Sequence, residues 1–195
     1  EVVVVPLSTR YQDREQTRGP LVRALQEVTR GRPGNYLFFF PSYAYMNMIY
    51  EDFSAAKEDG TELLLQQAGM TEEEREQFLA AFVPNPEPGR TFIAFAVMGG
   101  LFSEGIDLVG DRLTGVAIVG VGLPQIGPER NLIRDYFQAT GRDGFDYAYV
   151  YPGINKVLQA GGRLIRSETD YGRLALIDDR YLQSHYARLL PEEWH

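Results

Sequence analysis

The fold class follows from one stretch of the chain, Tyr36-Leu37-Phe38-Phe39-Phe40-Pro41-Ser42. Five consecutive apolar residues rich in aromatic rings predict a short buried strand that the proline ends. Ser42 is a suitable N-cap for a helix through about Phe53, because its hydroxyl can accept a hydrogen bond from the first helical turn. A strand without polar alternation, followed directly by a helix, is typical of a parallel sheet that helices cover on both faces.

The same alternation of strands and helices continues on both sides of this stretch. We expect further strands at 2–5, 91–97, 115–121 and 173–177, and helices at 13–30, 128–140, 147–166 and over a last segment that ends near residue 190. Residues 54–90 form an acidic insert of helical character to residue 82, with a capping box at 71–74, and then a proline-rich loop. The chain is therefore predicted to be a single three-layer α/β domain over residues 1–195, with five or six mostly parallel strands.

The composition of the 195 residues limits the chemistry of the chain. The absence of cysteine excludes disulfides, thiolate metal sites, iron–sulfur ligation and a cysteine nucleophile within it. A net charge of −8 excludes a surface coated in basic charge for nucleic acid, but it leaves room for a local basic groove. There is no apolar run of the length of about 18 residues that a membrane-spanning helix needs. Because residue 1 is glutamate and no signal peptide follows, we expect a piece of a longer protein or a processed chain.

The first candidate functional motif is the stretch 159–166, Gln-Ala-Gly-Gly-Arg-Leu-Ile-Arg. Gln159, Arg163 and Arg166 have the spacing i, i+4 and i+7, so they share one face of a helix. Two arginines beside glycines suit a polyanion such as phosphate, because guanidinium groups offer permanent charge and paired donors. The alternative is a solvated face whose arginines pair with Glu168 and Asp170.

The second candidate motif is the glycine-rich loop at 99–107, Gly-Gly-Leu-Phe-Ser-Glu-Gly-Ile-Asp, which directly follows the strand at 91–97. Ligands of α/β sheets bind at the carboxyl ends of the strands. Backbone N–H groups, together with the polar side chains of Ser103, Glu104 and Asp107, could contact such a ligand. The alternative is a structural turn.

Two further motifs resemble nucleotide-binding sequences but lack essential parts. The stretch Gly120-Val121-Gly122 has Gln125 where a dinucleotide loop needs its third glycine, which counts against an oxidoreductase. Residues 174–179, Leu-Ala-Leu-Ile-Asp-Asp, resemble a Walker B strand. The only two lysines, Lys57 and Lys156, do not follow the glycine-rich loop that a Walker B strand requires as its partner. The chain therefore has no phosphate-binding loop of its own.

The motifs together resemble those of the XPD/DinG family of superfamily 2 DNA helicases. Residues 103–107, Ser-Glu-Gly-Ile-Asp, resemble motif V, and residues 159–166 resemble motif VI, Q-x-x-G-R-x-x-R. Residues 38–43 resemble motif IV, and 170–172 and 179–181 resemble the sequence that follows motif VI in the family. The resemblance covers roughly residues 36–181. It implies the second RecA-like motor domain of an ATP-dependent DNA helicase, inactive without its first domain.

The same resemblance implies roles for individual residues. Arg163 and Arg166 would act as arginine fingers on the γ-phosphate, and Gln159 would orient the phosphates or the attacking water. The residues implied to contact the nucleotide are Glu104, Gly105, Asp107 and Gly162. The residues implied to contact single-stranded DNA are Ser42, Tyr43, Gly100 and Ser103.

The resemblance also implies partners. These are ATP, with Mg²⁺ held mainly by the first domain, single-stranded DNA, and the N-terminal helicase domain of the same protein. Any iron–sulfur cluster would belong to the missing part, and the protein would be intracellular, without a membrane partner, working in DNA repair and associated with the nucleoid if bacterial. The alternative function is a non-catalytic nucleotide- or nucleic-acid-binding module on a helicase-derived fold.

Overall fold

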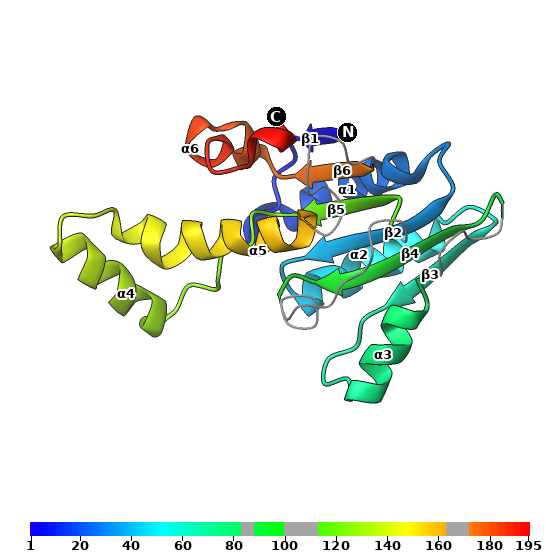
Figure 1. The fold of residues 1–195 in the computed structure, drawn as a ribbon, viewed down its shortest axis with the longest axis horizontal. Helices are drawn as coiled ribbons and strands as arrows, with labels where there is room; N and C mark the ends of the chain where they lie inside the picture. Colours follow the sequence, from blue (N-terminus) through cyan, green and yellow to red (C-terminus); the bar gives the residue numbers. More distant parts are fainter. Residues whose placement is uncertain (83–87, 100–112, 163–171) are drawn as a thin grey trace.

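The computed structural model describes residues 1–82, 88–99, 113–162 and 172–195, and Figure 1 shows their arrangement. They form one sheet with the strand order β1-β6-β5-β2-β4-β3. Every neighbouring pair of strands is parallel, as the apolar strand pattern predicted. The strands are β1 (Val2–Val5), β2 (Gly34–Phe40), β3 (Thr61–Leu65), β4 (Thr91–Val97), β5 (Gly115–Val119) and β6 (Arg173–Ile177).

Helices follow most of the strands, as a three-layer α/β domain requires. They are α1 (Arg14–Thr29), α2 (Tyr43–Ala55), α3 (Glu72–Ala80), α4 (Pro128–Ala139), α5 (Tyr151–Gly161) and α6 (Ser184–Ala187). A π-helical turn (Asp146–Val150) leads into α5, and short 3-10 turns occupy Tyr11–Asp13, Asp179–Leu182 and Glu192–Trp194. In Figure 1, α4 and the start of α5 extend away from the sheet as an arm. None of the helices in the described ranges is long and apolar enough to cross a membrane.

Strand β2 lies inside the sheet, and all seven of its residues are buried. Because successive side chains of a strand point to opposite faces, Phe38 and Phe40 pack in the cluster that contains α1 and α2. Leu37 and Phe39 pack in the cluster that contains α5. The stretch quoted from the sequence therefore contributes to both halves of the core.

The N-cap predicted at Ser42 is confirmed. Its side-chain oxygen accepts a hydrogen bond of 3.2 Å from the backbone N–H of Tyr45, and α2 begins at the next residue. The helix start predicted at 71–74 is confirmed too, since Thr71 Oγ1 accepts from the N–H of Glu74 at 3.2 Å and its hydroxyl donates to the Glu74 carboxylate. Local sequence signals of this kind locate helix starts well because the partners lie three residues apart.

The expectation that residues 54–82 are helical throughout is wrong. Residues Thr61–Leu65 form β3, which pairs with β4 along its whole length at the edge of the sheet. Three consecutive leucines form an apolar run too short to distinguish a helix from a strand, and the open edge beside β4 decides the outcome. The last segment also differs, since a 3-10 turn and the short α6 replace one continuous helix.

Candidate functional site

The carboxyl ends of the strands lie along a single edge of the sheet, since all six strands are parallel. We call this the carboxyl edge. Residues 6–10 follow β1, 41–43 follow β2, 98–99 follow β4, 120–122 follow β5 and 178–180 follow β6. This is the edge at which α/β sheets bind ligands.

Asp178 is the most strongly bonded carboxylate of the carboxyl edge. It is fully buried and accepts hydrogen bonds from Arg180 Nε at 2.8 Å and Nη2 at 2.9 Å, from the Arg180 backbone N–H at 2.8 Å, and from Thr9 Oγ1 at 2.5 Å. Burial alone would raise its pKa, but the hydrogen bonds from Arg180 and Thr9 outweigh burial and hold the pKa below the ordinary value. Asp178 is therefore an ionised structural anchor.

The neighbouring carboxylate, Asp179, is also paired. Its two oxygens accept from Nη1 of Arg10 at 2.8 and 3.0 Å. The acidic pair after β6 thus fixes the segment after β1 to the carboxyl edge through Thr9 and Arg10. Within the described ranges, no group of three or more His, Asp or Glu residues has the arrangement of a metal site.

The two glycines of Gly120-Val121-Gly122 allow a positive φ and a close approach of neighbouring backbone. Gly120 has φ +91° and its carbonyl accepts a hydrogen bond of 2.7 Å from the buried hydroxyl of Tyr181. Gly122 has φ +70°, and a Cβ there would lie 2.5 Å from the carbonyl oxygen of Gly153 near the start of α5. These contacts explain the two glycines without a dinucleotide.

Ser42 and Tyr43 lie at the carboxyl edge, at the start of α2. Both are half-buried, and the Ser42 hydroxyl caps the helix while Tyr43 packs against the core cluster of α1 and α2. Next to β2 in the sheet, β4 ends at Val97, and Met98 and Gly99 follow it. Gly99, at φ +85°, lies beside Lys156 of α5, whose Cε would be 3.8 Å from a Cβ at this position.

Gln159 and Gly162 lie elsewhere, at the C-terminal end of α5. Gln159 is exposed, and the N–H of Gly162 closes the helix on the carbonyl of Leu158 at 2.8 Å. The adjacent Gly161 packs against Trp194 and Leu174, and Leu174 is the second residue of β6. The structure therefore separates these two residues from Ser42 and Tyr43, which follow the last residue of β2.

The other predicted site residues lie outside the described residues. They are Gly100, Ser103, Glu104, Gly105, Asp107, Arg163 and Arg166. The sequence reasoning in turn missed Thr9, Arg10 and Arg14, which reach the carboxyl edge from the segment after β1. No local pattern marks these residues, because their partners are distant in the sequence.

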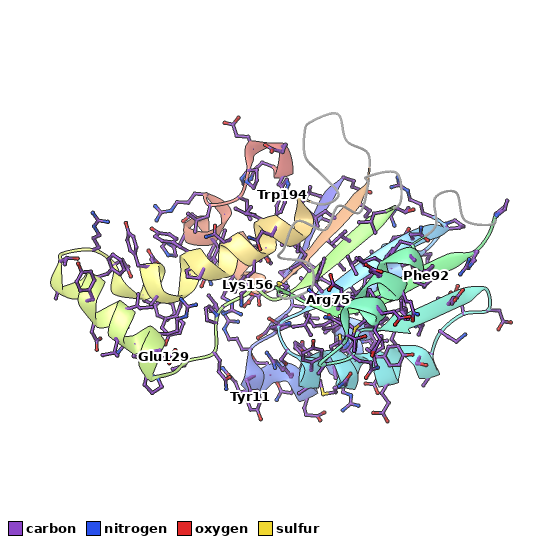
Figure 2. All side chains as sticks on the ribbon, turned by 60° about the horizontal axis from the view of Figure 1, so that its bottom comes forward. Tyr11, Arg75, Phe92, Glu129, Lys156 and Trp194 are labelled. Atoms are coloured by element: carbon purple, nitrogen blue, oxygen red, sulfur yellow. The ribbon has the colours of Figure 1, made fainter. Side chains whose placement is uncertain are left out.

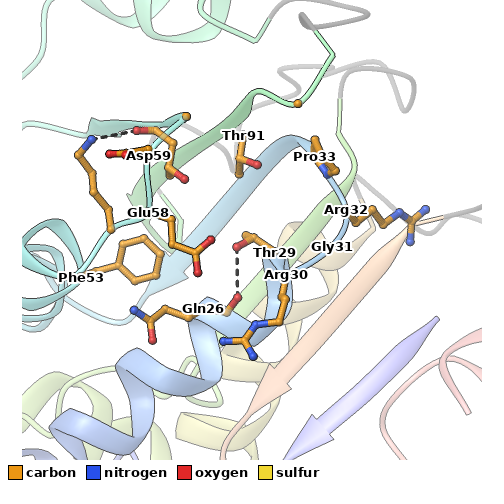
Figure 3. Close-up of a pocket in the computed structure, with 14 residues that line it drawn as sticks. Gln26, Thr29, Arg30, Gly31, Arg32, Pro33, Phe53, Glu58, Asp59 and Thr91 are labelled. Carbon is orange, nitrogen blue, oxygen red and sulfur yellow. Dashed lines mark hydrogen bonds between the residues drawn. The ribbon is translucent and has the colours of Figure 1, made fainter.

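A cavity of about 190 Å³ lies at the opposite edge of the sheet, where β3 and β4 begin, and Figure 3 shows its lining. Phe53 and Thr29 line it together with Arg30, Lys57 and Glu58. Nζ of Lys57 donates to the carbonyl of Thr61 at 3.1 Å. None of the predicted site residues that the structure describes lines this cavity.

Comparisons with known proteins give one consistent result. The family model described as the helicase C-terminal domain matches residues 25–195. The chain is 31% identical to the ATP-dependent DNA helicase DinG of Photobacterium profundum over 191 residues, which are 96% of this chain and 26% of DinG. It is 32% identical over 162 residues to a regulator of telomere elongation helicase 1 homolog of Anopheles gambiae, covering 76% of this chain and 16% of that protein.

Solved structures show the same fold. An XPD helicase superimposes with a TM-score of 0.73 at 18% identity, covering 97% of this chain and 33% of that chain. An apo form of XPD gives a TM-score of 0.70 at 19% identity, covering 96% of this chain and 37% of that one. The described sheet and helices therefore form the RecA-like α/β fold of these domains. The chain spans about a quarter or less of the length of these two curated relatives.

Proposed function

Because the chain belongs to the helicase C-terminal domain family, we propose that it is the second motor domain of an ATP-dependent DNA helicase. The family match over residues 25–195 carries this proposal. The absence of a phosphate-binding loop in the sequence supports it, since such a domain completes a nucleotide site that a first RecA-like domain begins. The arrangement of the sheet as a RecA-like fold supports it as well.

In this function, ATP binds between the two RecA-like domains. Arg163 and Arg166 act as arginine fingers that stabilise the charge of the transferring phosphoryl group, and Gln159 orients the phosphates or the water. Glu104, Gly105, Asp107 and Gly162 contact the nucleotide. The exposure of Gln159 near the end of α5, three residues before Gly162, supports a contact between this side chain and another domain.

In this function, single-stranded DNA contacts Ser42 and Tyr43 at the carboxyl edge of the sheet. It also contacts Gly100 and Ser103. The location of Ser42 and Tyr43 after β2, beside the end of β4, supports this placement. Mg²⁺ accompanies ATP and is held mainly by the first domain. Any iron–sulfur cluster belongs to that domain, since this chain contains no cysteine.

The decisive experiment measures DNA-stimulated ATP hydrolysis by the full-length protein. Arg163→Ala and Arg166→Ala should each lower turnover by roughly 10³-fold or more, the range expected for an arginine finger. Arg23→Ala is the matched control, because Arg23 is exposed on α1 and should leave turnover unchanged. Near wild-type turnover in both variants would remove the arginine-finger role. A full-length protein that binds nucleotide or DNA but never hydrolyses ATP would favour the non-catalytic module.

A further inference from the structure

Arg14, the first residue of α1, holds a half-buried guanidinium at the carboxyl edge. Its Nε donates to the carbonyl of Thr9 at 3.1 Å, and its Cζ lies 4.1 Å from the ring centroid of Tyr45 in the first turn of α2. Tyr45 is buried, so the ring and the carbonyl together fix the plane of the guanidinium. This contact connects α1 with α2 directly beside Ser42 and Tyr43.

Arg14 differs from the arginines around it because no carboxylate of the described ranges neutralises it. Arg10 pairs with Asp179 at 2.8 Å, and Arg180 pairs with Asp178 at 2.8 Å. One turn further along α1, Arg18 pairs with Asp52, with 3.0 Å between Nη2 and Oδ1. Among the described residues, no Asp or Glu forms an ion pair with Arg14, and its Nη1 and Nη2 atoms donate to none of their oxygens.

The surroundings therefore disfavour the charge that Arg14 carries. Burial lowers the pKa of the Arg14 guanidinium, Tyr45 and Tyr11 raise it in part, and the like charge of Arg180 lowers it again. A partly buried cation without a carboxylate partner is costly unless another anion completes the site. A phosphate diester is an anion that a planar, oriented guanidinium binds well, since its paired N–H donors match two phosphate oxygens.

An exposed aromatic ring stands next to this cation. Tyr11 is 85% exposed, the most exposed of the large hydrophobic side chains in the described ranges, and its ring centroid lies 5.6 Å from Cζ of Arg14. Figure 2 shows Tyr11 at the outer surface, at the start of α1. Proteins that bind single-stranded nucleic acid combine such cations, which hold the backbone, with exposed rings, which stack on bases.

We propose that Arg14 and Tyr11 form a nucleic-acid contact in which Arg14 binds a backbone phosphate and Tyr11 stacks on an adjacent base. The proposal rests on the proposed function and adds two residues to its DNA path. A nucleotide phosphate offers the same chemistry, but Arg14 lies beside the start of α2, whereas Gln159 and Gly162 lie at the end of α5. The exposed ring beside the cation also fits a strand of bases.

The test uses the full-length protein and a single-stranded oligonucleotide, with affinity measured over a series of salt concentrations. Arg14→Gln should weaken binding and reduce the slope of log K against log salt by about 0.7, the value for one phosphate of a single strand. Arg18→Gln is the matched control on the same helix and should leave the slope unchanged, because Asp52 already neutralises Arg18. Arg14→Lys keeps the charge and should keep the slope.

A second set of variants tests the ring of Tyr11. Tyr11→Ala should weaken binding roughly 10-fold without changing the slope, since stacking involves no counterion release. Tyr136→Ala is its control for the loss of an exposed ring, because Tyr136 is 65% exposed on α4 and is not part of the segment after β1, and it should leave affinity unchanged. A loss confined to Tyr11→Ala and Arg14→Gln supports the proposal.

Other outcomes overturn it. An unchanged slope in Arg14→Gln removes the phosphate contact, and a fall in ATP affinity with an unchanged DNA slope assigns Arg14 to the nucleotide. Equal losses in Arg14→Gln and Arg14→Lys, with a lower melting temperature in both, show that Arg14 only holds α1 against α2. A wild-type protein that binds no single-stranded DNA at all contradicts the proposed function itself, whereas normal binding with an unaffected Arg14→Gln variant contradicts this inference alone.

Discussion

Thr9 donates a hydrogen bond of 2.5 Å to Oδ2 of Asp178, and the two residues are 169 positions apart in the sequence. Both are buried, and the bond fixes the segment after β1 to the residue that follows β6. This bond between the segments that follow β1 and β6 therefore helps to hold the carboxyl edge together.

Thr9→Val should therefore destabilise the domain. Valine keeps the shape of threonine but removes the donor to a buried carboxylate, and we expect a loss of about 1–3 kcal/mol in the free energy of unfolding. Denaturant unfolding of the full-length protein, with hydrogen exchange in β1 and β6, measures it. Thr140→Val is the control, because the Thr140 hydroxyl bonds to the carbonyl of Phe137 at an exposed site. Equal effects in both variants would contradict the importance of the Asp178 bond.

Because of Asp178, the free energy of unfolding should fall as the pH falls in the acid range. Its pKa lies below the ordinary value, so the ionised form stabilises the fold above the ordinary carboxyl pKa. This contribution disappears as the pH falls through the lower pKa of the folded state. Asp178→Asn leaves Arg180 without its charge partner and should cost about 3–5 kcal/mol at pH 7, less at acid pH.

The measurement for Asp178 compares unfolding free energies at neutral and acid pH. The difference between wild type and Asp178→Asn should shrink steadily toward low pH. Asp135→Asn is the control, since Asp135 pairs at the surface with Arg134, and its effect should be small at every pH. A difference that stays constant with pH would show that Asp178 acts through its shape and not its charge.

Ser42 has a capping role that can be separated from a DNA role. Ser42→Ala removes the cap and should cost about 1 kcal/mol. Ser42→Asp keeps the cap, since aspartate accepts the same N–H, but adds a negative charge at the carboxyl edge. If DNA lies there, Ser42→Asp should weaken single-strand binding with little loss of stability, measured by a binding titration and thermal unfolding.

The corresponding control for Ser42 is Thr71→Asp. Thr71 caps α3 in the same way, and α3 follows β3, the edge strand that β4 separates from β2. Unchanged DNA affinity is expected there. Equal weakening by both aspartates would indicate general charge repulsion instead of a local contact at Ser42.

Two glycines within helices should respond to alanine to different degrees. A Cβ at Gly161 would clash with the ring of Trp194, so Gly161→Ala should destabilise the domain by about 1–3 kcal/mol. At Gly19 in α1, the nearest atom beyond the chain neighbours is the mobile end of Arg23 at 3.4 Å. Gly19→Ala should be close to neutral, because the gain of roughly 0.5–1 kcal/mol from helix propensity is offset by the clash of a Cβ with the ring of Pro20. Thermal unfolding measures both. Equal shifts in the two variants would contradict the packing of Gly161 on Trp194.

Local signals in the sequence predict much of the fold. The apolar run at Tyr36–Phe40 and the Ser42 cap are visible because each depends on residues close in sequence. Strand β3 could not be predicted in the same way, because Leu63–Leu65 become a strand only when β4 provides its edge. Contacts between residues far apart in the sequence, such as Thr9 and Asp178, could not be predicted either.

For the candidate site too, the sequence predicts some features and only the structure shows the others. Motif resemblance selects Gln159, Gly162, Ser42 and Tyr43, but the sequence does not show that the first two lie at the end of α5, away from the other two. The role of Arg14 has no sequence signal, since it depends on which neighbouring arginines find carboxylates in three dimensions. The roles of Arg163 and Arg166 stay predictions.

The sheet lies between the end of α5, which carries Gln159, and the start of α2, which carries Tyr43. It therefore also determines how these two parts of the domain can move. Strands β5, β2 and β4, buried in its middle, carry aromatic and branched side chains packed on both sides. Packed interiors resist compression and transmit strain instead of absorbing it. We therefore expect the end of α5 and the start of α2 to keep their relative positions when the domain moves, so that a displacement of one displaces the other.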